Sequence, residues 1–264
     1  MPRPAHVAYA LHGRKVMKLR TLPLALLLVF LAMAGAASAQ TPPPPPPGWA
    51  GSAGAGLALT QGNSDTSTVN AAYELKRDTG GDFVLRSAGL LVWGKSEGSL
   101  TNDRLSLDAR GERKLSPRTA LFVQAQYLRD SFKAIDYLIS PTVGVSRLLV
   151  KDDRTEFGVD AAVGVVWEQN PGLERQTDGA VIAGQQFARK LTATTELREK
   201  VAALWKMDDF GDALYTFGVG LAASVTSATQ LKVELLDSYK TRPPAADVKK
   251  NDVAVLVSFV YKFD

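Results

Sequence analysis

The last twelve residues of the chain, Asp252 to Phe263, form two interleaved rows, and one row is wholly apolar and ends in aromatic residues. Successive residues of a β-strand point to opposite faces, so these rows predict a strand with one apolar face. Such a strand at the end of a chain is typical of a barrel that meets lipid on its outer side. The apolar row is Val253, Val255, Val257, Phe259, Tyr261 and Phe263.

The N-terminus has the features of a secretory leader. Residues 22–34 form an apolar core that follows basic residues, and Ala37-Ser38-Ala39 supplies the small-x-small pattern of a cleavage site. We therefore predict a signal peptide over residues 1–39. Met17 begins a conventional signal peptide by itself, which supports the hypothesis that translation starts there.

The mature chain lacks the side chains that many enzymes and metal sites require. His6 and His12 are the only histidines, both lie in the leader, and cysteine is absent. Ser-His and Cys-His relays and thiolate or histidine metal sites are therefore excluded after cleavage. We expect no cofactor, no metal and no enzymatic activity.

The charge of the mature chain argues against nucleic acid as a partner. Five of the 31 basic residues and none of the 27 acidic ones lie in residues 1–39, which leaves 26 basic against 27 acidic residues. The basic character of the whole sequence therefore belongs to the leader, and a nucleic-acid footprint is absent.

A proline run separates the leader from the rest of the chain. Residues 40–48 contain six consecutive prolines, which favour a stiff polyproline II spacer in the periplasm over a ligand for a periplasmic partner. After residue 40 no apolar run reaches the ~18 residues that a spanning helix requires. Any membrane span of the mature chain must then consist of strands.

From Trp49 onward the alternation predicts an all-β, up-and-down antiparallel barrel of about twelve transmembrane strands, which occupies residues 49–264. The strand lengths fit the ~9–11 residues that a tilted membrane strand needs. The predicted strands are 49–61, 66–77, 82–95, 103–115, 120–130, 139–149, 155–169, 178–191, 195–206, 213–225, 230–239 and 252–263.

The connections between these strands alternate in length. Those after even-numbered strands are tight, such as 78–81, whereas those after odd-numbered strands are mostly longer, such as 96–102 and 131–138. Outer-membrane barrels have short periplasmic turns and longer outer loops, so both termini are predicted to be periplasmic.

The pleat assigns side chains to the two faces of the wall. In the strand 103–115, leucines alternate with charged residues, and we expect the leucines to face lipid and the charges to face the lumen. Glu199 fits poorly because its parity places it with lipid, and the adjacent Gln185 and Gln186 leave their strand without a clean face. A β-bulge is expected to correct either strand.

The charges predicted to face the lumen have two interpretations. They form either a charged pore lining that selects solutes or a salt-bridged plug that fills the bore, and we favour a plug or a very narrow channel. The candidates are Arg86, Arg104, Asp108, Arg110, Glu112, Glu156, Asp160, Lys232 and Glu234, with Glu74, Glu196, Arg198 and Lys200 on the same face.

Two smaller patterns have simpler explanations than ligand binding. Asp208, Asp209 and Asp212 in one outer loop suggest a divalent cation, but they lack the spacing of an EF-hand and favour a solvated loop. The segment Gly51 to Gly56 is similar to a phosphate loop only superficially. A small-residue strand packed near the seam of the barrel explains it better.

The start of the predicted barrel resembles a known family. Trp49 is followed by Gly51, Gly54 and Gly56, and then by Leu59 to Thr66 with the turn Gly62-Asn63-Ser64. This resembles the YdiY-like family of salt-induced outer membrane proteins, and the similarity extends to Phe263. The resemblance implies a barrel with no established activity or ligand. Barrels of this class commonly end on an aromatic residue, whereas here Asp264 follows Phe263.

The sequence therefore predicts an outer-membrane protein of a Gram-negative bacterium, with a structural or narrow-channel role and a link to salt or osmotic response. Its expected partners are outer-membrane lipid and lipopolysaccharide, the outer-membrane assembly machinery, periplasmic chaperones, and small solutes or ions. A solute-selective, porin-like channel is the first alternative. A histidine-independent enzyme that uses Asp108, Asp160 or Glu168, and a soluble periplasmic ligand-binding barrel, are less favoured.

Overall fold

The computed structural model describes residues 48–61, 66–96 and 99–263. The predicted signal peptide and all but the last residue of the proline-rich spacer lie outside these residues. Within the described ranges no helix has the length and apolar character needed to cross a membrane.

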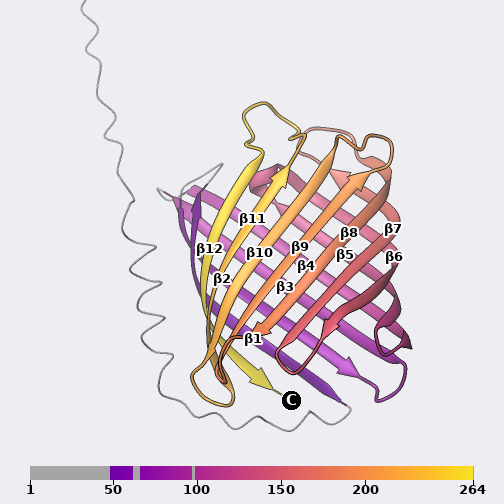
Figure 1. Ribbon diagram of the computed structural model, residues 1–264. Coiled ribbons are helices and arrows are strands. Elements are labelled where there is room, and N and C mark those ends of the chain that lie inside the picture. Colours follow the sequence, from indigo (N-terminus) through magenta and orange to yellow (C-terminus); the bar gives the residue numbers. More distant parts are fainter. Residues whose placement is uncertain (1–47, 62–65, 97–98, 264) are drawn as a thin grey trace, which may run out of the picture. The chain divides into compact units, whose positions relative to one another are not determined.

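The described residues form a closed barrel of twelve antiparallel strands, as predicted (Figure 1). Each strand pairs with its neighbours in sequence, and β1 closes the barrel against β12. A single turn of 3-10 helix, η1, spans Ser131–Lys133. The strands are β1 Trp49–Gln61, β2 Thr66–Asp78, β3 Phe83–Ser96, β4 Ser99–Ser116, β5 Thr119–Asp130, β6 Ile135–Lys151, β7 Thr155–Gln169, β8 Gln176–Lys190, β9 Thr195–Lys206, β10 Ala213–Ser224, β11 Thr229–Lys240 and β12 Asn251–Phe263.

Two strands begin four residues earlier than the sequence predicted. β4 begins at Ser99 rather than at residue 103, and β6 begins at Ile135 rather than at residue 139. Backbone pairing extends both strands past the end of the apolar alternation, so a prediction from side chains alone stopped short. The outer connections at 97–98 and 131–134 are consequently short, and long outer loops occur only after β7, β9 and β11.

Small residues close the seam of the barrel, as predicted for the glycine-rich first strand. Gly56 of β1 pairs with Asn70 of β2 on one side and with Ser258 of β12 on the other. Ser258 Oγ donates to Asn70 Oδ1 at 2.9 Å, so these two side chains meet over β1. A Cβ at Gly56 would collide with the carbonyl oxygen of Val257, which explains the glycine at this position.

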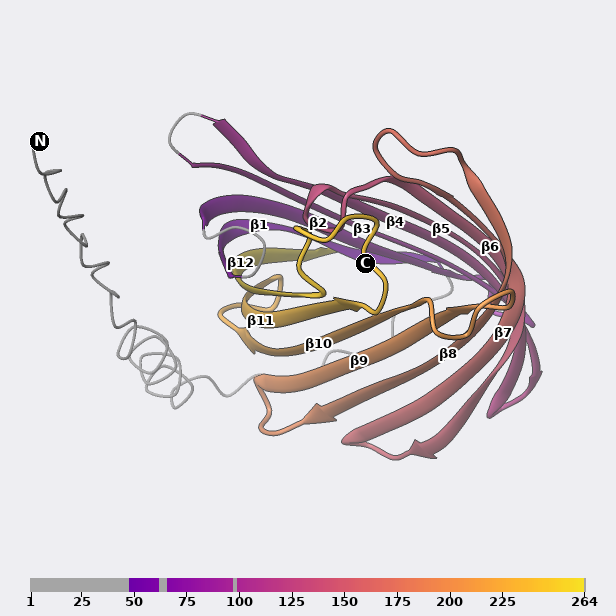
Figure 2. The same cartoon turned by 90° about the horizontal axis from the view of Figure 1, so that it is seen from above.

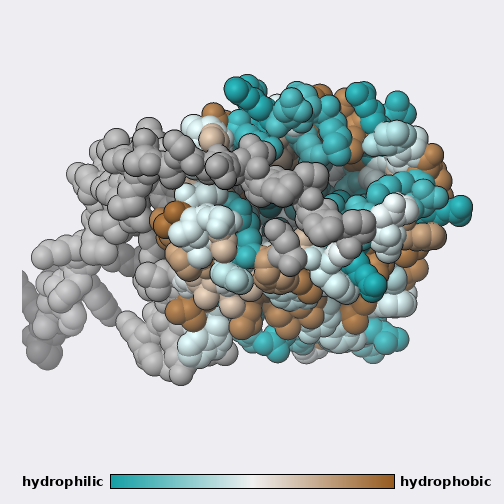
Figure 3. Space-filling model, turned by 90° about the horizontal axis from the view of Figure 1, so that it is seen from below, coloured by the Kyte–Doolittle hydropathy of each residue, from teal (hydrophilic) through white to brown (hydrophobic). Residues whose placement is uncertain are grey.

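The outer surface of the barrel is apolar along the strands. Leu107, Val123 and Val163 are exposed, and Leu107 belongs to the leucine row of the strand 103–115 that the sequence assigned to lipid. In the view from below, hydrophobic residues recur around the outline of the barrel (Figure 3). The assignment to the outer face is therefore confirmed for Leu107.

The inner surface is less uniformly charged than the sequence suggested. Seven buried apolar residues from β5 to β10 pack together, and Ile182 covers them. All but one have the opposite parity to exposed residues of their barrel wall such as Val123 and Val163, so they line the bore. The exception, Ile135, lies beyond a register shift between β5 and β6. The cluster is Leu128, Ile135, Leu138, Val166, Ala180, Leu204 and Leu214.

The prediction of a β-bulge near Glu199 or Gln185 is wrong. The register of β9 is continuous over its described pairs with both β8 and β10. Glu199 and Gln185 therefore both remain on the outer face, where Gln185 Nε2 donates to Glu199 Oε1 at 2.8 Å.

Candidate functional site

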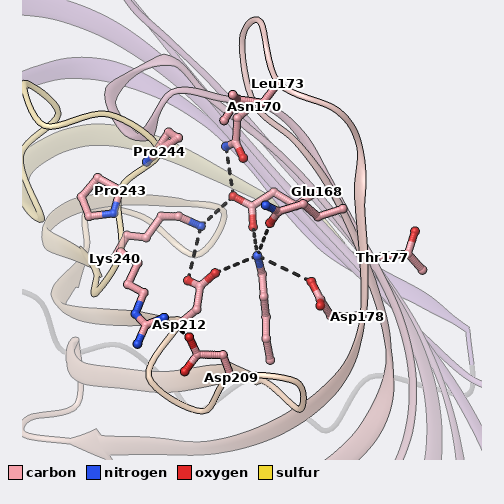
Figure 4. Close-up of a pocket in the computed structure, with 13 residues that line it drawn as sticks. Glu168, Asn170, Leu173, Thr177, Asp178, Asp209, Asp212, Lys240, Pro243 and Pro244 are labelled. Atoms are coloured by element: carbon pink, nitrogen blue, oxygen red, sulfur yellow. Dashed lines mark hydrogen bonds and ion pairs between the residues drawn. The ribbon is translucent and has the colours of Figure 1, made fainter.

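A buried carboxylate, Glu168, organises the outer mouth of the barrel (Figure 4). Lys240 Nζ donates to one of its oxygens at 2.6 Å, and the ammonium of Lys206 forms an ion pair with the other at 2.9 Å. Lys206 also contacts Asp212 at 2.8 Å, and Asn170 Nδ2 donates to Glu168 at 3.1 Å. The network thus joins β7, β9 and β11 with the loop between β9 and β10.

These ion pairs pass over the bore instead of following a single ladder. Lys240 lies on β11 and Glu168 on β7, which are four strands apart in the closed order. Only 1% of Glu168 is exposed. Burying such charges is costly unless each is paired, and removal of one partner from a buried pair costs about 3–5 kcal/mol.

The turn between β5 and β6 contributes a second buried lysine to this mouth. Lys133 Nζ contacts Asp252 at 2.7 Å and donates to the backbone oxygen of Lys250 at 2.8 Å. Asp130 caps η1 by accepting from the backbone N–H of Phe132, and it lies 3.5 Å from Arg104. Seen from above, the β11–β12 loop folds over the opening and meets this turn (Figure 2).

A pocket of about 620 Å³ lies within the outer mouth. Arg242 pairs there with Asp209, so two of the three loop aspartates, Asp209 and Asp212, have basic partners. Among the described residues no group of histidine, cysteine, aspartate or glutamate is arranged to hold a metal ion. The lining is Glu168, Asn170, Leu173, Gln176, Thr177, Asp178, Lys206, Asp209, Asp212, Lys240, Arg242, Pro243 and Pro244.

A second network lies on the wall formed by β4 to β7. Arg110 contacts Glu112 at 2.8 Å and Asp160 at 3.2 Å, and its guanidinium lies 3.6 Å from the ring centroid of Phe122. Gln124 donates to Asp108 in the same group. Charge pairing and the aromatic ring together fix Arg110 against the wall.

A third contact crosses the lumen. Arg198 Nη1 on β9 lies 3.5 Å from Glu74 Oε2 on β2, and the closed strand order puts these strands five positions apart along the shorter path. Arg198 also contacts Glu196 at 2.5 Å. At this level the lumen is narrow enough for one arginine and one glutamate to meet across it.

The charged residues singled out from the sequence fall into several separate groups. Arg110, Glu112, Asp160 and Asp108 belong to the wall network, and Arg86 joins it through Glu112 at 3.3 Å. The other four are placed elsewhere: Arg104 contacts Asp130 near the outer mouth, Lys232 and Glu234 pair with each other at 2.9 Å, and Glu156 pairs with Lys151 at the end of β6.

The lysines of the mouth network were not predicted from the sequence. Lys206 and Lys240 are the last residues of β9 and β11 and share the inward parity of their strands, whereas Lys133 lies in η1 between two strands. An inward-facing lysine at the outer end of a predicted strand could have been recognised as a candidate from the sequence. The sequence pattern does not show which acidic residues on other strands such a lysine contacts.

Solved structures with this fold include outer-membrane proteins. The NanC porin matches with a TM-score of 0.55 and 9% identity, over 80% of this chain and 100% of that one. The KdgM porin matches with a TM-score of 0.49 and 9% identity, over 81% of this chain and 99% of that one. The translocator domain of the autotransporter NalP from Neisseria meningitidis matches with a TM-score of 0.49 and 11% identity, over 91% of this chain and 94% of that one. No curated protein matches this sequence significantly.

A family model matches residues 53–263, which include nearly the whole barrel. The matching family has no established function, as the sequence resemblance implied. Its description contains neither the YdiY-like nor the salt-induced name. The chain belongs to the family described as "Protein of unknown function, DUF481".

Proposed function

We propose that this protein resides in the outer membrane of a Gram-negative bacterium and that ion pairs narrow its bore, so that it passes small ions at most. The contact between Arg198 and Glu74 across the lumen carries this proposal. The apolar outer wall and the fold shared with the NanC porin support the membrane location.

Barrel size does not decide between a channel and a plug. Twelve strands lie between small barrels that side chains fill and 16-stranded porins that leave an aqueous channel. The side chains therefore determine the bore. Here they cross it between Arg198 and Glu74, between Lys133 and Asp252, and between Lys240 and Glu168. Solutes larger than a small ion would have to displace these pairs.

Membrane fractionation followed by conductance in a planar bilayer tests the proposal. The protein is expected in the outer-membrane fraction, to require detergent for extraction, and to give a conductance well below that of a wide porin after refolding. Recovery in the aqueous fraction, or a conductance equal to that of a wide porin, would contradict it.

A solute-selective channel is the second candidate, and the mouth pocket favours it. The pocket presents basic and acidic side chains around about 620 Å³, which suits a small solute bearing both charges. Such a solute is expected to block the ion current in a concentration-dependent manner. If the barrel is a plug without a solute site, the solute should leave the current unchanged.

The remaining expectations belong to the same proposal. Residues 1–39 would export the chain, the proline-rich spacer would separate the leader from the barrel, and assembly would use periplasmic chaperones and the outer-membrane machinery. Lipid and lipopolysaccharide would surround the barrel. The lack of histidine and cysteine after residue 39 favours a protein that is not an enzyme, and a salt-response role would predict increased expression at high osmolarity.

A further inference from the structure

A hydrogen-bonded polar pair interrupts the apolar outer wall. Glu199 on β9 pairs in register with Phe187 on β8, and Gln185 pairs with Val201. These residues have the same outward parity as Trp205. Gln185 Nε2 donates to Glu199 Oε1 at 2.8 Å, so an amide and a carboxyl lie side by side on the surface that the proposed function places in lipid.

The pair lies within the depth of the apolar band. Trp205, which donates to the hydroxyl of Tyr215 at 3.0 Å, stands near the outer end of β9, and Glu199 lies six residues further in. At ~3.3 Å per residue and a strand tilt of ~40°, this is ~15 Å below the outer aromatic residues of a band that is ~25 Å tall. Gln185 is nearer the outer end than Glu199, so the carboxyl turns away from the inner interface.

The other outward charges with recorded partners lie at the ends of strands. Arg129 and Asp103 pair at the outer ends of β5 and β4. Arg77 lies over the ring of Trp49 at the inner ends of β2 and β1. Those groups can reach water, whereas lipid tails offer Glu199 no hydrogen-bond donor beyond Gln185. A polar group that faces hydrocarbon in this way calls for a protein partner.

We propose that two copies of this chain meet through the β7–β9 face, defined here as Ala161, Ala183, Gln185 and Glu199. This proposal rests on the membrane location given under the proposed function. The pair is self-complementary, because a two-fold axis sets the amide donor of one copy opposite the carboxyl acceptor of the other. Ala161 and Ala183 pair across β7 and β8 and are exposed, so the two walls can approach closely.

The absence of cysteine from the chain permits a direct test. Ala183→Cys places one thiol on the proposed contact, and Val123→Cys places one on β5, where the side chain is 62% exposed on the outer wall. Oxidation with copper phenanthroline in native outer membranes is expected to give a disulfide-linked dimer for Ala183→Cys and none for Val123→Cys. Glu199→Leu in the Ala183→Cys background is expected to reduce dimer yield about tenfold, or about 1.4 kcal/mol.

Conservative and folding controls complete the experiment. Glu199→Gln keeps a hydrogen-bonding side chain and is expected to retain the dimer, and Glu199→Leu removes a charge from a lipid-facing site, so the barrel should still assemble. Membrane insertion without cross-linking, equal cross-linking at both sites, or cross-linking that Glu199→Leu leaves unchanged would overturn the contact alone. A cross-linked product of another mass, or lipopolysaccharide retained by the monomer through Glu199, would overturn it in favour of that occupant. Recovery of the chain in the aqueous fraction would refute the membrane location as well.

Discussion

Lys133 and Asp252 connect opposite sides of the outer mouth through an ammonium–carboxylate contact of 2.7 Å. Lys133 ends η1, between β5 and β6, and Asp252 lies at the start of β12. Lys133 Nζ also donates to the backbone oxygen of Lys250. The backbone N–H of Lys240 donates to the same oxygen at 2.8 Å. One buried side chain therefore holds the end of the β11–β12 loop against the β5–β6 turn.

Replacing this lysine is expected to release the loop while the wall stays intact. Lys133→Met keeps the length of the side chain but removes the ammonium that pairs with Asp252. Protease added to intact cells should then cut within residues 241–250 faster than in the original protein. Lys151→Met, which removes an exposed partner of Glu156 at the other end of the barrel, should leave the cutting rate unchanged. Equal cutting of both variants would show that Lys133 does not hold the loop.

Loss of the central carboxylate of the mouth network is expected to destabilise the barrel strongly. Glu168→Ala leaves Lys206 and Lys240 buried without this acceptor, which should lower the free energy of unfolding by about 3 kcal/mol or more. Glu156→Ala breaks an exposed pair and should cost less than about 1 kcal/mol. Urea unfolding of both variants in lipid vesicles provides the measurement, and similar losses for the two would contradict the role given to Glu168.

The seam of the barrel is expected to depend on Gly56. Gly56→Ala brings a Cβ against the carbonyl oxygen of Val257, so closure should be strained by about 1–3 kcal/mol. Gly81→Ala is the control, because a Cβ there meets only Thr79 Oγ1 at 3.9 Å. The folded fraction after refolding into detergent should fall for Gly56→Ala alone, and a normal yield for both variants would disprove strain at the seam.

One turn is expected to show a small dependence on acid. The pKa of Asp152 lies below its usual value because the backbone N–H groups of Arg154 and Thr155 donate to its carboxylate. Since the folded pKa is depressed, the turn is stabilised above the unfolded pKa of about 3.9, and this contribution is lost as the pH falls through the folded pKa. An NMR titration of Asp152 should give a midpoint below 3.9; a midpoint at or above it would refute these hydrogen bonds.

Strand positions and faces could be predicted because they depend on local alternation. Leu107 lies on the outer face for the same reason that the leucines of its strand were assigned to it, the two-residue period of the strand. Contacts across the lumen could not be predicted in this way. Arg198 and Glu74 are 124 residues apart, and their meeting depends on how the register accumulates around the closed barrel.

Two further differences have physical causes. Leu128 and Leu138 line the bore although they are apolar, because their positions in the pleat decide the face regardless of chemistry. A β-bulge was expected to move Glu199 away from the lipid-facing side, but the regular pairing of β9 with β8 and β10 keeps its side chain on the outer face. In both cases the backbone register, rather than the polarity of the residue, determined where the side chain lies.

Conductance across a planar bilayer, measured for the original protein and for the Glu74→Ala, Arg198→Ala double variant, tests most directly whether ion pairs narrow the bore. The exposed fractions of these side chains are 57% and 55%, so the double variant should lose less than about 1 kcal/mol of stability and should fold normally. We expect a small conductance for the original protein and a clearly larger one for the double variant. Equal conductances of two folded proteins would contradict it.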